Sequence, residues 1–162
     1  MHLRRLAGLL GLASIAAPGA QAATATTTFQ VLANVQSTCI AAATDLNFGN
    51  VGVITAPIDQ TSTITVTCTN GTTYNVGLNA GTGTGATLPS RKMVNGTNLL
   101  NYTLFRDTAR TQIWGTTVGT DTVAGAGNGN AQNLTVYGRI LAPQTSPPPG
   151  LYTDTITVTV TY

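Results

Sequence analysis

Short runs of alternating apolar and polar residues recur along the chain, and this period of two predicts β-strands. The apolar faces of these runs are Phe29, Val31, Ala33 and Val35; Ile64, Val66 and Cys68; Tyr74, Val76, Leu78 and Ala80; Leu100, Tyr102 and Leu104; Leu134, Val136, Gly138 and Ile140; and Ile156, Val158, Val160 and Tyr162. A further short strand is expected over residues 116–123. No window favours an amphipathic helix.

Turn signals separate these runs. Asn70-Gly71 predicts a type I′ hairpin, and Asn95-Gly96 predicts a second tight turn. Gly/Thr-rich residues 81–87 and Gly/Asn-rich residues 125–130 are expected to be loops, and Pro147 to Gly150 ends any regular element. Evenly spaced short strands predict a single all-β domain with the architecture of a β-sandwich.

Composition agrees with strands and excludes several functions. The 162 residues include 32 Thr, no Glu and a single His, His2. Thr favours strand geometry, whereas a soluble helical bundle needs Glu, Lys and Arg on its outer faces. Only 7% of the residues are charged, so nucleic-acid binding is not expected.

The first 22 residues have the pattern of an export signal. Arg4 and Arg5 precede an apolar stretch over residues 6–17, and Ala20-Gln21-Ala22 fits a small-x-small cleavage site. The apolar stretch is shorter than the roughly 20 residues that span a bilayer. Cleavage after Ala22 would leave 140 residues with five basic and five acidic side chains. The formal net charge of this chain is zero, so charge repulsion would not oppose the association of copies.

Cys39 and Cys68 are expected to form a disulfide, because an exported chain with an even number of cysteines favours pairing. No His is left after cleavage to complete a zinc site or to activate a serine. Five scattered Asp residues lie near predicted turns, where Asp usually caps the backbone. We therefore expect no catalytic residue, no metal and no cofactor, and we interpret Trp114 as a packing residue rather than a carbohydrate platform.

The two ends of the predicted sandwich show complementary features. The alternation of the last strand continues to Tyr162, and an exposed strand edge can pair with another chain. Residues 24–35 form a long alternating segment, which is a suitable ligand for such an edge. Either one copy's segment fills a gap in the next copy, which would give a filament, or the segment pairs within its own sandwich.

Several segments together carry a family resemblance. They are Thr24 to Val31, Asp45-Leu46-Asn47-Phe48-Gly49, Ser62 to Gly71, Tyr102 to Arg110, Leu134 to Ile140 and Tyr152 to Tyr162. In these segments the chain resembles the spore coat protein U domain family, which includes the pilins of Csu-type archaic chaperone–usher pili. The likeness extends over nearly the whole chain after the signal.

The resemblance implies an incomplete immunoglobulin-like β-sandwich that is completed by donor-strand complementation. Residues 1–22 would be the signal peptide, 23–35 the donor-strand extension and 36–162 the pilin domain. The implied donor residues are Ala25, Thr27, Phe29 and Val31, and the implied acceptor edge is Ile156, Val158, Val160 and Tyr162. Cys39 and Cys68 match the family's disulfide. Because Leu32 is out of phase, a register with Gln30 and Leu32 facing inward stays open.

The implied function is that of a structural fimbrial subunit that polymerises head-to-tail by donor-strand exchange. Its partners would be related pilin subunits, a periplasmic chaperone and an outer-membrane usher. The product would be an extracellular fimbrium on the cell surface that supports adhesion and biofilm formation. The alternative is a secreted spore-coat protein or extracellular β-sandwich binding module.

Overall fold

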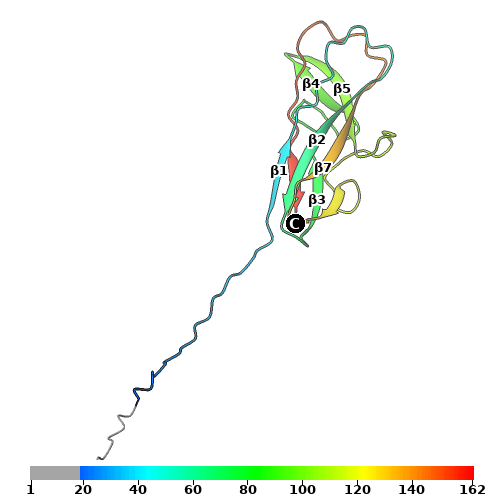
Figure 1. Ribbon diagram of the computed structural model, residues 1–162. Coiled ribbons are helices and arrows are strands. Elements are labelled where there is room, and N and C mark those ends of the chain that lie inside the picture. Colours follow the sequence, from blue (N-terminus) through cyan, green and yellow to red (C-terminus); the bar gives the residue numbers. More distant parts are fainter. Residues whose placement is uncertain (1–18) are drawn as a thin grey trace, which may run out of the picture. The chain divides into compact units, whose positions relative to one another are not determined.

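The computed structural model describes residues 19–162, so most of the predicted signal peptide, residues 1–18, lies outside the described part of the chain. The chain divides into two units between Asn34 and Val35. Residues 19–34 carry no strand and are exposed throughout, whereas residues 35–162 hold all the strands (Figure 1). The strands are β1 (Cys39–Ala43), β2 (Ile58–Cys68), β3 (Thr73–Leu78), β4 (Arg91–Asn95), β5 (Asn98–Phe105), β6 (Val123–Ala126), β7 (Gln132–Ile140) and β8 (Val158–Thr161).

The strands form two antiparallel sheets. One has five strands in the order β1-β2-β7-β5-β4, and the other has three in the order β6-β3-β8. Strand β2 lies second from the edge, pairing with β1 on one side and with β7 on the other. The predicted all-β sandwich is confirmed, and the part of the chain that the structure describes contains no helix.

The core lies between the sheets and is built from the apolar faces that the alternation predicts. Its buried members are Ile64, Val66, Cys68, Tyr74, Val76, Leu78, Leu100, Tyr102, Leu104, Val136 and Ile140. Trp114 is fully buried as well, and its indole Nε1–H donates to the Val76 carbonyl at 2.8 Å. The interpretation of Trp114 as a packing residue is therefore confirmed.

A disulfide joins β1 to β2 at one end of the sandwich. Cys39 and Cys68 are directly opposite in the β1–β2 register and are covalently bonded, as expected. The ladder continues upstream of β1, because Thr69 N–H donates to the Thr38 carbonyl at 2.9 Å. The Thr69 hydroxyl also donates to the Gln36 carbonyl at 3.1 Å, so residues 36–38 are fixed to the end of β2.

The predicted hairpin at Asn70-Gly71 is wrong. The turn is tight, with Gly71 at φ +81°, but it carries the chain from one sheet to the other. Both edges of β2 are already occupied by β1 and β7, so β3 cannot pair with it. By contrast, the turn at Asn95-Gly96 joins β4 and β5 in a hairpin, as predicted.

The strand predicted over residues 116–123 is also wrong. That segment is a loop in which the Asp121 carboxylate accepts a hydrogen bond from Thr117 N–H at 2.6 Å. Strand β6 begins only at Val123 and occupies part of the stretch expected to be a Gly/Asn loop. Gly125 lies under the Tyr74 ring, where a side chain would clash, so this strand carries little apolar signal in the sequence.

Candidate functional site

A groove opens between the two sheets along the side where β1 and β8 are the edge strands. β1 and β8 lie close to each other (Figure 1) but are not hydrogen-bonded as a pair. The groove contains a cavity of about 740 Å³. Its floor is apolar and comes from both sheets: Ile64, Leu78, Leu100, Leu104, Val136 and Ile140 line it. A cavity of this size within a sandwich core is large enough to hold several side chains.

One wall of the groove is the extended segment that leads into β8. Residues 151–160 alternate between exposed and half-buried positions, and the half-buried ones include Ile156, Val158 and Val160. These three side chains pack against the core, while Tyr162 is 60% exposed. The predicted inward face of the last strand is therefore seen for Ile156, Val158 and Val160. It is wrong for Tyr162, which follows the end of the regular strand β8 (Val158–Thr161) and does not pack against the core.

The main chain of this wall has a free edge. Thr157 accepts a hydrogen bond from Asn79 N–H at 3.2 Å, and Thr153 exchanges two hydrogen bonds with Val94 at 2.8 and 3.1 Å. Because successive residues of a strand present their N–H and C=O groups to opposite sides, the groups of Ile156 and Val158 face away from β3. Within residues 19–162 no further strand pairs with that edge.

The opposite wall, β1, presents small side chains. Its inward positions are Ala41 and Ala43, which lie opposite Val66 and Ile64 in the register. An alanine on an inward position leaves space that a larger side chain would fill, and Ala43 lines the cavity. Beyond β1 the chain continues along the groove, where Leu46 and Phe48 pack against the core.

A hydrogen-bonded pair of polar residues, Tyr102 and Asp154, lies in the groove. The Tyr102 hydroxyl donates to Asp154 Oδ2 at 2.7 Å, and both residues line the cavity. Asp154 Oδ1 accepts from Thr82 N–H at 2.8 Å, from the Thr82 hydroxyl at 2.9 Å and from Thr155 N–H at 2.7 Å. Burial and the hydrogen bond to Asp154 raise the pKa of Tyr102 above its usual range. Tyr102 therefore stays a neutral donor, and the carboxylate is held by four hydrogen bonds.

A fully buried arginine supports the Leu78 end of the groove. Arg91 has 0% relative exposure and donates to four main-chain carbonyl groups, at 2.9 Å to Asn79, 3.0 Å to Leu88, 3.2 Å to Leu78 and 2.6 Å to Trp114. Burial lowers its pKa to about 10, so the guanidinium stays charged at neutral pH. The side chain thus connects β4 to the end of β3 and to the loop that holds Trp114.

The predicted donor residues lie in the other unit of the chain. Ala25, Thr27, Phe29 and Val31 are exposed, with Phe29 at 86% and Val31 at 85%. Residues 19–38 form no strand, so the alternative in which this segment pairs within its own sandwich has no counterpart in the described structure.

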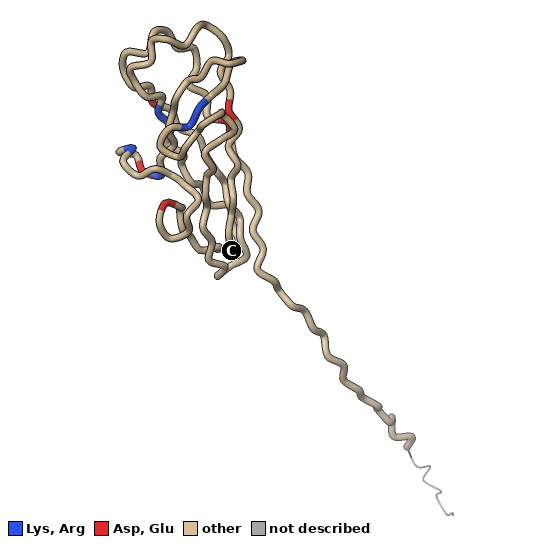
Figure 2. Tube along the Cα trace, turned by 180° about the vertical axis from the view of Figure 1, so that it is seen from behind, with Lys and Arg blue, Asp and Glu red and all other residues tan. Residues whose placement is uncertain are grey.

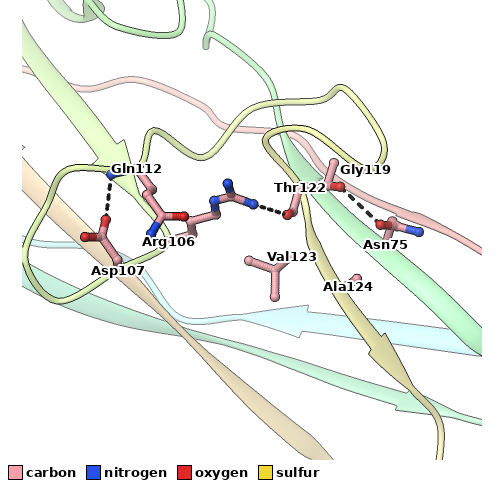
Figure 3. Close-up of a pocket in the computed structure, with 8 residues that line it drawn as sticks. All are labelled: Asn75, Arg106, Asp107, Gln112, Gly119, Thr122, Val123 and Ala124. Carbon is pink, nitrogen blue, oxygen red and sulfur yellow. Dashed lines mark hydrogen bonds between the residues drawn. The ribbon is translucent and has the colours of Figure 1, made fainter.

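A second, smaller depression lies between the loops around residues 106–124 (Figure 3). It has a volume of about 370 Å³. The polar groups around it bond mainly to one another: Arg106 donates to the Thr122 carbonyl at 2.8 Å, and Gln112 N–H donates to Asp107 at 2.7 Å. These contacts hold the loops in place and do not converge on a common point.

Other site types find no support in the described residues. Figure 2 shows that the positions of charged residues along the Cα trace of this part of the chain are few and scattered. Residues 19–162 contain no group of three or more His, Cys, Asp or Glu side chains that could hold a metal ion. Nor does a helix long and apolar enough to cross a membrane occur among them.

Sequence reasoning missed several residues of the groove. Tyr102 was placed on a core face but not in a site, and Asp154 was interpreted only as a residue near a turn. Leu46 and Phe48 lie between two of the alternating runs, yet they pack over β7, where a Cβ on Gly138 would be 2.6 Å from Leu46 Cδ1. A glycine inside an otherwise regular strand indicates such a close approach and is the signal that could have found them.

Comparisons with known proteins agree with this architecture. The chain is 33% identical over 159 residues to Protein U of Myxococcus xanthus, a match that covers 88% of each chain. It is also similar to a chain in the crystal structure of the CsuC–CsuE chaperone–tip adhesion subunit pre-assembly complex from archaic chaperone–usher Csu pili of Acinetobacter baumannii. That match has a TM-score of 0.59 and 25% identity, and it covers 79% of this chain but only 40% of the solved one. The Spore Coat Protein U domain model matches residues 25–159. The chain therefore belongs to the spore coat protein U domain family.

Proposed function

We propose that this protein is a structural subunit of an archaic chaperone–usher fimbria of the Csu type, and that it polymerises by donor-strand exchange. The observation that carries the proposal is the apolar groove beside the free edge of β8. Residues 23–35 of one copy would lie in the groove of the next. Residues 1–22 would be removed on export, and residues 36–162 would form the domain that accepts the strand.

The alternation of the segment suits this groove. Phe29 and Val31 point to one side of an extended chain and would replace the missing apolar contacts of the core. Burying a Phe or Val side chain stabilises by about 1.5–3 kcal/mol, and each main-chain hydrogen bond to β8 adds roughly 1 kcal/mol. Ordering the free segment offsets part of this gain. The sum favours slow dissociation of neighbouring subunits.

The partners follow from the same site. The similar solved structure is that of a complex between a chaperone and a pilus subunit. A periplasmic chaperone would cover the groove of this chain before assembly, and an outer-membrane usher would be the place where the next subunit's segment replaces it. The product would be an extracellular fimbrium that supports adhesion and biofilm formation, with a structural rather than a catalytic role.

A second function is favoured by one comparison. Protein U is 33% identical to this chain, and the matching family model is described as a spore coat domain. A spore-coat or other extracellular layer protein is therefore the alternative. Such a protein would remain a stable monomer, or would assemble without residues 23–35.

The test replaces Phe29 by Asp in the chain that begins at Ala23, with co-expression of a chaperone. A buried carboxylate without a partner is strongly unfavourable, so Phe29→Asp should leave a soluble subunit but reduce fibres to background in electron microscopy. The matched control is Gln30→Asp, which places the same charge on the opposite face and should still polymerise. Normal fibres from Phe29→Asp would contradict the proposal.

A further inference from the structure

The hydrogen-bonded pair of Asp154 and Tyr102 in the groove suggests how the incoming strand is aligned. The Asp154 carboxylate is held by four hydrogen bonds and, with Tyr102, lines the cavity whose floor includes Ile64, Leu78 and Val136. Because all four bonds come from the protein itself, the carboxylate cannot swing aside to admit a larger side chain. This inference rests on the proposed function and adds the register of the inserted strand.

Every strand pair of the two sheets is antiparallel, so we take the inserted strand to run antiparallel to β8 as well. β1 begins at Cys39, opposite the end of β2, and β8 ends near Thr161, opposite Asn75 at the start of β3. The turn at Asn70-Gly71 joins the end of β2 to the start of β3, so β1 leaves this end of the sandwich while β8 approaches it. A strand that is antiparallel to β8 therefore enters beside the disulfide and leaves beside residues 150–153.

Only a few registers remain once Phe29 and Val31 face inward. In each of them, an odd-numbered residue of the segment lies opposite an even-numbered residue of the β8 wall, because opposite residues share a face. The residue opposite Asp154 is then Phe29, Val31, Ala33 or Val35. Of these four side chains, only the methyl group of Ala33 is small enough to lie over the fixed carboxylate without displacing it.

The shape of the cavity selects the same register independently. With Ala33 opposite Asp154, Val31 lies opposite Ile156 and Phe29 opposite Val158, and these are the two aliphatic residues on the inward face of the wall that line the cavity. The smaller residues Ala25 and Thr27 then lie toward the disulfide end, where β1 approaches β8. The two large inward side chains of the segment, Phe29 and Val31, thus lie opposite aliphatic residues that line the cavity.

We propose that the Asp154–Tyr102 pair sets the register of the inserted strand, with Ala33 of the next copy of this chain opposite Asp154. The pair acts as a specificity determinant: it accepts a small side chain at one position and so fixes where Phe29 and Val31 enter the core. Along the groove, the inward side chains of the segment are a small one at Thr27, a large one at Phe29, a medium one at Val31 and a small one at Ala33.

Engineered cysteine pairs test this register directly. In the proposed alignment Leu32 lies opposite Thr155 on the outer face, as a non-hydrogen-bonded pair whose close Cα spacing suits a disulfide. Chains that carry Leu32→Cys together with Thr155→Cys should give a ladder of disulfide-linked oligomers on a non-reducing gel. Thr153→Cys and Thr157→Cys, each combined with Leu32→Cys, are matched controls at exposed threonines and should give at least about tenfold less.

The role of Asp154 is tested on the exposed segment, where a substitution does not touch the folded domain. Ala33→Leu should slow oligomer formation by about tenfold or more, whereas Asn34→Leu, on the outer face, should leave the rate within about twofold. Adding Asp154→Ala to Ala33→Leu should restore part of the rate. An unchanged rate for Ala33→Leu overturns the role of Asp154.

The outcomes separate the inference from the proposed function. If oligomers form but Leu32→Cys links to Thr153→Cys or Thr157→Cys instead, the register is wrong and donor-strand exchange stands. If Gln30→Cys rather than Leu32→Cys gives the ladder with Thr155→Cys, the inference is overturned in the same way. If no chain forms oligomers, including the unmodified one, the proposed function itself fails.

Discussion

Removing the buried guanidinium of Arg91 should lower the stability of the domain by several kcal/mol. Arg91→Met keeps most of the side-chain length but removes all the donors. Its four carbonyl partners then lose hydrogen bonds at 2.6–3.2 Å. The bonds to Asn79 and Leu88 are part-buried, so water can replace them, whereas those to Leu78 and Trp114 are buried.

The magnitude follows from the two buried carbonyl groups. Leaving a buried polar group without a partner costs about 1–3 kcal/mol, so two such groups cost about 4 kcal/mol. Arg91→Met also removes the free-energy cost of burying the charged guanidinium. This gain offsets part of the loss of the hydrogen bonds. A loss of about 4 kcal/mol is a large share of the 5–15 kcal/mol typical of a domain.

Chemical denaturation of the variants measures the difference. Lys92→Met is the matched control, because Lys92 is the next residue in β4 and makes a single exposed hydrogen bond to Thr84 at 3.3 Å. Arg91→Lys should fall between the two, since one ammonium group cannot reach all four carbonyl groups. If Arg91→Met costs less than about 1 kcal/mol, or no more than Lys92→Met, the argument from unpaired carbonyls is refuted.

Two further predictions concern covalent and ionic links between strands. Replacing Cys39 and Cys68 together by Ser should lower the free energy of unfolding by about 3–4 kcal/mol, because the disulfide closes a loop over a sequence separation of 29. Equal melting temperatures of the unmodified protein with and without a reducing agent would contradict this prediction. The hydrogen bond from Arg139, with Arg110 nearby, lowers the pKa of Asp59, so the pair stabilises the fold at neutral pH and this contribution is lost as the pH falls through the lowered pKa. Because Asp59 is partly exposed, Asp59→Asn should cost less than about 1 kcal/mol at pH 7, and the cost should shrink as the pH is lowered in a series of paired thermal melts.

The predicted strands succeeded where burial follows a strict alternation. β2, β3, β5 and β7 each place a run of apolar side chains at alternate positions on the face toward the core. β1 was missed as a strand because its inward positions, Ala41 and Ala43, face the open groove and carry little apolar signal. β4 was missed because its fully buried position is occupied by Arg91, a residue type that a pattern assigns to the surface.

The residues of the candidate site likewise include some that the sequence predicts and some that it does not. Alternation and family resemblance named the donor residues and the acceptor edge, because each is a property of one segment. Asp154 and Tyr102 are 52 residues apart, and no local pattern indicates that their side chains meet at 2.7 Å. The register proposed for the inserted strand depends on that contact.

By itself, the sequence of this protein determined the fold class, the disulfide, most of the core faces and the family, since these depend on periodicity, composition and motif. The tertiary structure alone decided that the Asn70-Gly71 turn joins two sheets, that the side between β1 and β8 is open, and that a fixed carboxylate interrupts the apolar groove. The physical reason is that strand pairing and groove shape come from contacts between residues far apart in the chain. An alternating strand has the same local pattern whether its neighbour belongs to its own chain or to another.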